Sequence, residues 1–180
     1  MNRRQFIGIA AGTAAGFGLW RFTRSSASAG PPVGHARPST ASEVQTVEKS
    51  DSEWREELAP DAYKVLRKEG TEAPGSSALN AVKAKGEFQC AGCGLALFPS
   101  DYKYESGTGW PSFYDYIDGH LEFKTDFKML MPRKEYHCAR CGGHQGHVFK
   151  DGPDPTGLRY CNNGVALKFV PADDRDDQPA

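Results

Sequence analysis

The sequence lacks an apolar run long enough for a membrane-spanning helix near its N-terminus. The Gly/Ala-rich apolar segment there, from Phe6 to Trp20, has 15 residues, whereas a span needs about 20. Acidic residues are also absent from positions 1–29, where four arginines flank the apolar segment. This pattern is typical of a signal peptide and not of an element of a folded core.

The paired arginines at positions 3 and 4 point to a particular export route. The run from Asn2 to Ile7, Asn-Arg-Arg-Gln-Phe-Ile, resembles the twin-arginine signal of bacteria, and residues 27–29, Ala-Ser-Ala, resemble a cleavage site. We therefore expect residues 1–29 to be a signal peptide read by the export machinery for folded proteins, with the periplasm as destination. If the signal is not cleaved, the same segment would stay as a membrane anchor.

The near-neutral composition conceals an acidic folded part. The whole chain has 22 basic and 23 acidic side chains. Without the four arginines of the expected signal the balance is 18 against 23, a formal charge of about −5. Because the chain also lacks a cluster of Lys or Arg, this charge argues against nucleic-acid binding. The contents of 11% aromatic and 25% charged residues exclude wholesale disorder, a collagen-like chain and a coiled coil.

Composition divides the rest of the chain into three parts. Residues 30–47 are rich in Pro, Ser, Thr and Ala without apolar periodicity, which predicts a flexible linker. Residues 48–172 are expected to form one folded domain. Residues 173–180 are expected to be an acidic tail.

The folded part begins with a helical pattern and continues with a β pattern. Between Asp51 and Gly70, apolar residues recur three and four apart on either side of Pro60, which predicts two short helices. After Gly70, short apolar runs alternate with Gly, Pro and Asp, which predicts a mainly β, mostly antiparallel α+β fold. The expected strand segments are residues 87–89, 121–124, 128–131, 135–137, 148–149 and 165–169.

Five cysteines carry the most chemical information. Four of them form two identical Cys-x-x-Cys-Gly motifs, with Cys90 and Cys93 in the first and Cys138 and Cys141 in the second. Two such pairs are typical of a zinc site, in which four thiolates surround the ion at about 2.3 Å. Because no coordination position is left for water or substrate, one zinc ion held in this way would be structural.

Two other interpretations of the paired cysteines stay open at this point. Each pair could form a disulfide in an exported protein, or act as a redox-active Cys-x-x-Cys motif. The repeated motif with its glycine favours metal. The export route favours it too, because a protein that is exported folded can be loaded with zinc beforehand.

Cys161 is the fifth cysteine and lies outside both motifs. Its neighbours Arg159, Asn162 and Asn163 supply a positive charge and hydrogen-bond donors, which favour the reactive thiolate. The same residue would equally suit a small buried side chain on a strand. The local sequence alone does not decide between a nucleophile and a core residue.

Two other segments favour chemistry at this cysteine. His144 and His147 lie three apart on a Gly-rich stretch directly after the second cysteine pair, and such pairs bind or catalyse more often than a lone histidine does. Residues 106–113, Ser-Gly-Thr-Gly-Trp-Pro-Ser-Phe, place Trp110 and Phe113 in a loop suited to the wall of a small apolar pocket.

Four segments together closely resemble the B-type peptide methionine sulfoxide reductases, which reduce the R epimer of methionine sulfoxide. They are the cysteine motif at 90–94, the loop at 106–113, Arg-Cys-Gly-Gly-His-Gln-Gly-His-Val-Phe at 140–149 and Gly-Leu-Arg-Tyr-Cys-Asn-Asn at 157–163. The resemblance extends from about Asp51 to Pro171. It implies two antiparallel β-sheets with short N-terminal helices outside, stapled by one structural zinc on the four paired cysteines.

The resemblance also implies a substrate and a set of residues that act on it. The substrates would be oxidised proteins or peptides that contain methionine sulfoxide. The implied site comprises Cys161 as the nucleophile, His144, His147 and Asn163 as its polar partners, Arg159 as an electrostatic neighbour, and Trp110 with Phe113 as the wall for the substrate methyl group.

One departure from the family pattern concerns how the oxidised Cys161 is reduced again after each turnover. Many members carry a second cysteine in the loop where this chain has Thr108. With four cysteines on zinc, Cys161 has no partner for an internal disulfide. We therefore expect a thioredoxin-like protein or a small thiol to reduce its sulfenic acid.

Two competing classes of function stay open on the sequence. A zinc-stapled binding module would leave Cys161 inert. An exported disulfide oxidoreductase would use the paired cysteines as disulfides and would hold no zinc.

Overall fold

The computed structural model describes residues 44–127 and 132–174. The expected signal peptide, most of the linker, the strand expected at 128–131 and the tail beyond residue 174 lie outside these ranges. Within them, no helix has both the length and the apolar character that crossing a membrane would require. At the end of the expected linker, the backbone N–H of Val47 donates to the carbonyl of Arg140 at 2.7 Å, so this residue already contacts the folded domain.

Two short helices open the domain, as the pattern around Pro60 predicts. Helix α1 (Asp51–Glu57) begins at Ser50 with a capping box, because the Ser50 hydroxyl accepts from the Glu53 N–H and the Glu53 carboxylate accepts from the Ser50 N–H. Helix α2 (Pro60–Lys68) has its proline in the first turn, where a missing N–H costs no hydrogen bond.

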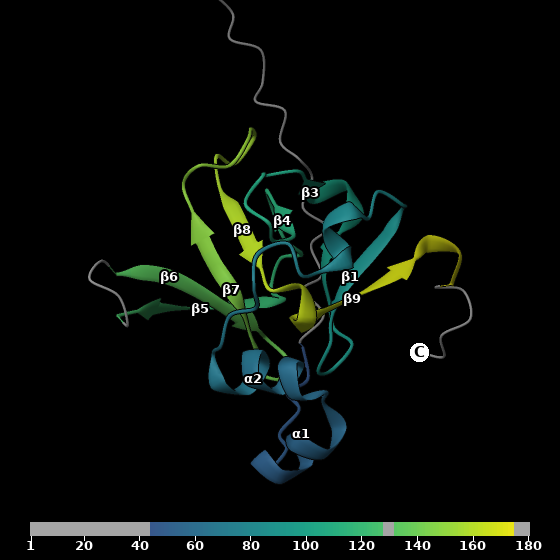
Figure 1. The fold of residues 1–180 in the computed structure, drawn as a ribbon, viewed down its shortest axis with the longest axis vertical. Coiled ribbons are helices and arrows are strands. Elements are labelled where there is room, and N and C mark those ends of the chain that lie inside the picture. Colours follow the sequence, from purple (N-terminus) through teal and green to yellow (C-terminus); the bar gives the residue numbers. More distant parts are fainter. Residues whose placement is uncertain (1–43, 128–131, 175–180) are drawn as a thin grey trace, which may run out of the picture. The chain divides into compact units, whose positions relative to one another are not determined.

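The strands of the described chain form two antiparallel sheets, which confirms the expected fold class (Figure 1). The smaller sheet has the order β2-β1-β9 and the larger the order β3-β4-β8-β7-β6-β5. The strands are β1 (Gly86–Cys90), β2 (Ala96–Pro99), β3 (Lys103–Tyr104), β4 (Ser112–Phe113), β5 (Leu121–Asp126), β6 (Arg133–Cys138), β7 (His144–Phe149), β8 (Arg159–Asn162) and β9 (Leu167–Pro171). Short 3₁₀ helices are η1 (Ala78–Ala81), η2 (Ser100–Tyr102), η3 (Gly164–Ala166) and η4 (Ala172–Asp174).

Sequence pattern located the longer strands better than the shorter ones. The expected segments at 87–89, 121–124, 135–137 and 148–149 fall in β1, β5, β6 and β7. The segment at 165–169 begins as a 3₁₀ turn and becomes strand only at Leu167. Strands β3 and β4 have two residues each, too few to show any periodicity, and exist only because neighbouring strands pair with them.

Aromatic rings join the two sheets in the core. Phe98 of β2 and Phe113 of β4 are fully buried and stack with centroids 4.1 Å apart and planes 7° from parallel. Phe88 of β1 meets Phe113 edge-on at 5.0 Å, and Tyr136 of β6 meets Phe98 edge-on at 6.2 Å. Since Phe98 and Phe113 belong to different sheets, their contact helps to set how the sheets pack.

This core predicts a large penalty for removing one ring. We expect Phe98→Ala to lower the free energy of unfolding by about 3–5 kcal/mol, because the substitution loses buried area and leaves a cavity. Phe127→Ala is the matched control, since Phe127 is 74% exposed, and it should change stability by less than about 0.5 kcal/mol. Denaturant titration of both variants measures this, and equal losses would contradict the assigned core.

Candidate active site and metal centre

The two cysteine motifs fold into the same local turn. In each motif the glycine that follows the second cysteine donates its N–H to the carbonyl of the first, from Gly94 to Cys90 at 2.9 Å and from Gly142 to Cys138 at 2.8 Å. Both glycines have positive φ, 76° and 67°, a conformation that other residues rarely adopt. The glycine of each motif therefore closes the turn that carries the two thiols.

The four sulfur atoms lie together in an arrangement that fits one metal ion. All four Sγ atoms are within 4.8 Å of one another. The Cys90–Cys141 and Cys93–Cys138 sulfur separations are 3.7 and 3.5 Å. A disulfide needs about 2.05 Å, whereas tetrahedral ligands at 2.3 Å from zinc lie about 3.8 Å apart. These two separations join cysteines of different motifs, and none of the four cysteines forms a disulfide with its partner in the same motif. The geometry thus favours a metal site shared by both motifs over two disulfides.

The metal centre and strand β8 are joined by one buried side chain. The Gln145 amide donates to the Cys90 Sγ at 3.3 Å, and its oxygen accepts from the Asn162 amide at 3.2 Å. The backbone carbonyl of Gln145 accepts from both the backbone N–H and the side-chain amide of Asn163, each at 2.9 Å. Donors to a ligating sulfur commonly orient metal ligands, so Gln145 serves both the cysteine cluster and the residues after Cys161.

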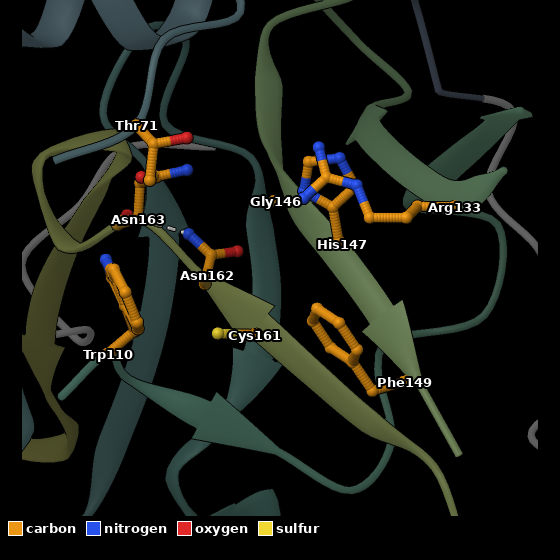
Figure 2. A pocket seen from close by; sticks show the side chains of 9 residues that line it. All are labelled: Thr71, Trp110, Arg133, Gly146, His147, Phe149, Cys161, Asn162 and Asn163. Carbon is orange, nitrogen blue, oxygen red and sulfur yellow. Dashed lines mark hydrogen bonds between the residues drawn. The ribbon is translucent and has the colours of Figure 1, made fainter. Parts of the chain in front are cut away.

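Cys161 occupies the middle of the larger sheet. Strand β8 lies between β4 and β7, and the register places Cys161 opposite Ser112 on one side and His147 on the other. The thiol lines a pocket of about 110 Å³ (Figure 2). In this view Trp110 and Phe149 lie on opposite sides of the sulfur. The pocket is lined by Thr71, Trp110, Arg133, Gly146, His147, Phe149, Cys161, Asn162 and Asn163.

Burial dominates the electrostatics of the thiol. It raises the pKa of Cys161 above the ordinary thiol value, while the positive charge of Arg159 and a hydrogen bond with Thr108 act in the opposite direction. Arg159 is itself held by two hydrogen bonds of 2.9 Å to the Asp151 carboxylate. Because the pKa is raised overall, Cys161 is a thiol at neutral pH and forms the thiolate only as the pH rises.

His147 is the histidine that reaches the pocket. Its Nε2 lies 3.0 Å from Oδ2 of Asp126, and burial lowers its pKa below the ordinary histidine value. His144 lies outside the pocket lining and is 1% exposed. Its Nδ1 is 3.5 Å from Oε2 of Glu135, and its ring is edge-on to that of His147 with centroids 5.5 Å apart. The two histidines of the motif therefore occupy different surroundings.

Of the other expected site residues, Trp110 and Asn163 line the pocket and Phe113 lies in the core. The Trp110 indole lines the pocket and is anchored by its Nε1, which donates to the Glu72 carbonyl at 3.3 Å. Asn163 also lines it, but its side-chain oxygen accepts from the Glu72 N–H at 3.0 Å. Phe113 is fully buried between the sheets and is absent from the pocket lining. Strand alternation explains this, because Phe113 and its neighbour Ser112 point to opposite faces.

The structure adds pocket residues that sequence reasoning missed. Thr71 comes from the loop after α2, Arg133 from the start of β6 and Phe149 from the end of β7. Thr71 and Arg133 belong to no motif that marks reactivity, and Phe149 ends the 140–149 segment, in which only the two histidines indicate reactivity. Their proximity to Cys161 depends on strand order, which no local pattern reveals.

A two-sheet β domain with four clustered cysteines that could hold a metal ion, and with a separate pocket thiol, defines the class of this protein. The chain belongs to the family described as the SelR domain, whose model matches residues 58–171. This confirms the family resemblance of the four segments, since the curated relatives carry the name of the same reductases.

Curated relatives match over nearly their whole length. "Peptide methionine sulfoxide reductase MsrB" of Methanosarcina barkeri is 55% identical over 126 residues, which are 69% of this chain and 89% of the relative. The protein of the same name from Leptospira interrogans is 53% identical over 68% of this chain and 95% of its own. That of Bradyrhizobium diazoefficiens is 50% identical over 68% and 89%.

The position of Arg159 predicts its effect on thiol reactivity. Replacing it in Arg159→Met removes the charge that opposes burial, so the pKa of Cys161 should rise further and less thiolate should form at pH 8. We expect iodoacetamide to alkylate Cys161 about five- to tenfold more slowly. Mass spectrometry over a pH series measures the rate.

The control for this experiment is Lys150→Met, which removes one positive charge from an exposed residue at the end of β7. It should leave the alkylation rate unchanged. Equal slowing in both variants would show that net charge, and not the position of Arg159, controls the thiol.

Proposed function

We propose that this protein reduces methionine sulfoxide in proteins and peptides, that it accepts the R epimer, and that Cys161 is the nucleophile. The observation that carries the proposal is the placement of the Cys161 thiol in one pocket with the Trp110 indole and the His147 imidazole. The curated relatives named as peptide methionine sulfoxide reductases support the same reaction.

Substrate recognition follows from the chemistry of the pocket wall. Methionine sulfoxide ends in a tetrahedral sulfur with one polar oxygen and one methyl group. Trp110 and Phe149 supply apolar surface for the methyl group. Arg133 supplies N–H donors for the oxygen, and His147 supplies one after it has taken the thiol proton. The opposite epimer would exchange these groups and bury the oxygen against the indole, at a cost of about 1–3 kcal/mol.

In the proposed step, oxygen moves from the substrate sulfur to Cys161. The Cys161 sulfur attacks the sulfoxide sulfur and forms a sulfur–sulfur bond while the protonated oxygen leaves the substrate sulfur. The oxygen, as hydroxide, then bonds to the Cys161 sulfur as the sulfur–sulfur bond breaks, and the products are methionine and Cys161 sulfenic acid. The substrate sulfur is reduced by two electrons and the cysteine sulfur is oxidised by two. His147 accepts the thiol proton and delivers it to the sulfoxide oxygen, so no net proton is consumed in this step.

An external thiol then restores the enzyme. One thiol reacts with the sulfenic acid to give a mixed disulfide and water, and a second releases Cys161 as the thiol together with the oxidised reductant. An internal route lacks a second free cysteine, since the other four of the five are in the metal motifs and Thr108 stands in the loop beside Cys161. A thioredoxin-like protein or a small thiol is the proposed donor.

The metal in the cysteine cluster is proposed to be one structural zinc. Four thiolates at these separations suit zinc, and they leave no position for substrate. When bound, the ion would tie the two motifs together, and Gln145 would orient Cys90.

We also propose export to the periplasm, on the basis of the arginine pair and apolar segment in residues 1–29.

A pair of serine variants separates the two roles of cysteine. Cys161→Ser should abolish reduction of the R epimer while keeping one zinc per chain and the wild-type fold, because Cys161 lies outside the metal centre. Cys93→Ser should lose zinc and become unstable. Turnover of both epimers of a dabsylated methionine sulfoxide, together with metal analysis, measures this.

Residual turnover in Cys161→Ser would refute the nucleophile. Equal reduction of both epimers by the wild-type protein would refute the proposed selectivity. A protein that holds zinc but reduces neither epimer would instead be a binding module.

The proposed reduction of Cys161 by an external thiol predicts which oxidised form of the protein accumulates when no reductant is present. Without a reductant, one equivalent of substrate should leave Cys161 as a sulfenic acid that dimedone labels, and no intramolecular disulfide should form. In Thr108→Cys the new thiol should capture it as a disulfide, because residue 108 contacts Cys161. Mass spectrometry of non-reduced peptides distinguishes the two outcomes. An internal disulfide in the wild-type protein would contradict the external route.

A further inference from the structure

A buried carboxylate lies behind the pocket, on the strand beyond β6. Asp126, the last residue of β5, has a side chain that is 2% exposed. Its Oδ2 lies 3.0 Å from Nε2 of His147 and accepts a hydrogen bond of 2.7 Å from Nη2 of Arg133. Both partners line the pocket, whereas Asp126 does not. One carboxylate oxygen therefore holds two pocket residues from behind.

We propose that Asp126 is a positioning residue for the reductase reaction, which holds His147 by Nε2 so that Nδ1 exchanges protons with the pocket. This inference rests on the proposed function. It adds a residue that neither the motifs nor the pocket lining indicates.

The hydrogen bond to Asp126 selects the tautomer of His147. A carboxylate accepts but does not donate, so the nitrogen that faces it carries the proton. In neutral His147 the proton is therefore on Nε2 and the lone pair is on Nδ1. That lone pair can take the proton of the Cys161 thiol, and the same nitrogen can then donate to the sulfoxide oxygen. Without the carboxylate, both tautomers would be populated and part of the protein would present the wrong nitrogen.

Opposing charges act on the protonation of His147. Burial lowers its pKa, and the nearby charge of Arg133 acts in the same direction. The hydrogen bond and charge of Asp126 and the charge of Glu135 raise it, but the net shift is downward. The groups that face His147 are Asp126 from β5, Arg133 and Glu135 from β6, His144 on its own strand and Cys161 from β8.

Strand register brings these groups together. Asp126 and Arg133 are partners in the β5–β6 ladder, and Glu135 and His147 are partners in the β6–β7 ladder. The hydrogen bond between Asp126 and His147 therefore spans β6, which lies between their strands. A purely structural interpretation is that Asp126 only neutralises Arg133 in a buried place. The two interpretations differ in what happens to His147 when each partner is removed.

The test uses two variants with opposite expected effects on His147. Asp126→Asn removes the charge that favours the protonated ring, so the titration of His147 should move to lower pH. Arg133→Met removes a charge that opposes protonation, so the titration should move to higher pH. Nitrogen NMR of the histidine side chains in the zinc-loaded, substrate-free protein measures both, with His147→Asn to assign the signal.

Activity provides the second measurement. For Asp126→Asn we expect kcat at pH 7 to fall about tenfold, because part of the neutral His147 then presents an N–H and not the lone pair to the Cys161 thiol, and the loss of kcat toward acid pH, where the ring is protonated, should begin at lower pH. Asp151→Asn is the control, since it removes a carboxylate that binds Arg159 and does not face His147. It should leave the His147 titration where it is.

Three outcomes decide the inference. Opposite shifts in Asp126→Asn and Arg133→Met, with no shift in Asp151→Asn, support a positioning role. Reduced thermal stability in the first two variants with an unmoved His147 titration overturns it and leaves Asp126 a structural partner of Arg133. A wild-type protein without reductase activity refutes the proposed function, and the NMR shifts would still report whether Asp126 holds His147.

Discussion

The site depends on the pairing of β8 with β7 in the middle of the larger sheet. This ladder sets Cys161 opposite His147, with Gly146 beside them. A Cβ on Gly146 would lie 1.9 Å from the Cys161 carbonyl oxygen, so only glycine permits the two backbones to approach this closely. Backbone pairing holds β7 and β8 together, so the side chains of His147 and Cys161 can line the pocket.

The four-cysteine cluster and the pocket share strand β6 but no residue. Gln145 contacts Cys90 through its amide and Asn162 through its oxygen, so one buried residue touches both parts. A four-sulfur site offers no open coordination position. Under the proposed function, a metal bound there would hold the two cysteine turns in place, and the redox chemistry would belong to Cys161, outside the cluster.

Burial favours the neutral forms of both Cys161 and His147. It raises the pKa of Cys161 and lowers that of His147, so near neutral pH the proton stays on sulfur and the imidazole is uncharged. A neutral thiol and imidazole are less costly to enclose than an ion pair. Arg159 and Asp126 act against these shifts at the cysteine and the histidine respectively, each from behind the pocket.

Features that depend on near neighbours along the chain can be predicted from the amino-acid sequence. Two residues between paired cysteines, with a glycine after them, suffice for a metal-binding turn, and Pro60 suffices to separate two helices. Which side chains share a surface depends on the folded structure. It placed Phe113 in the core and Trp110 in the pocket although both lie in one motif, and it gave His144 surroundings different from those of His147. It also brought Asp126 and Arg133 to His147, because partners across strands follow from register and strand order, which local sequence does not encode.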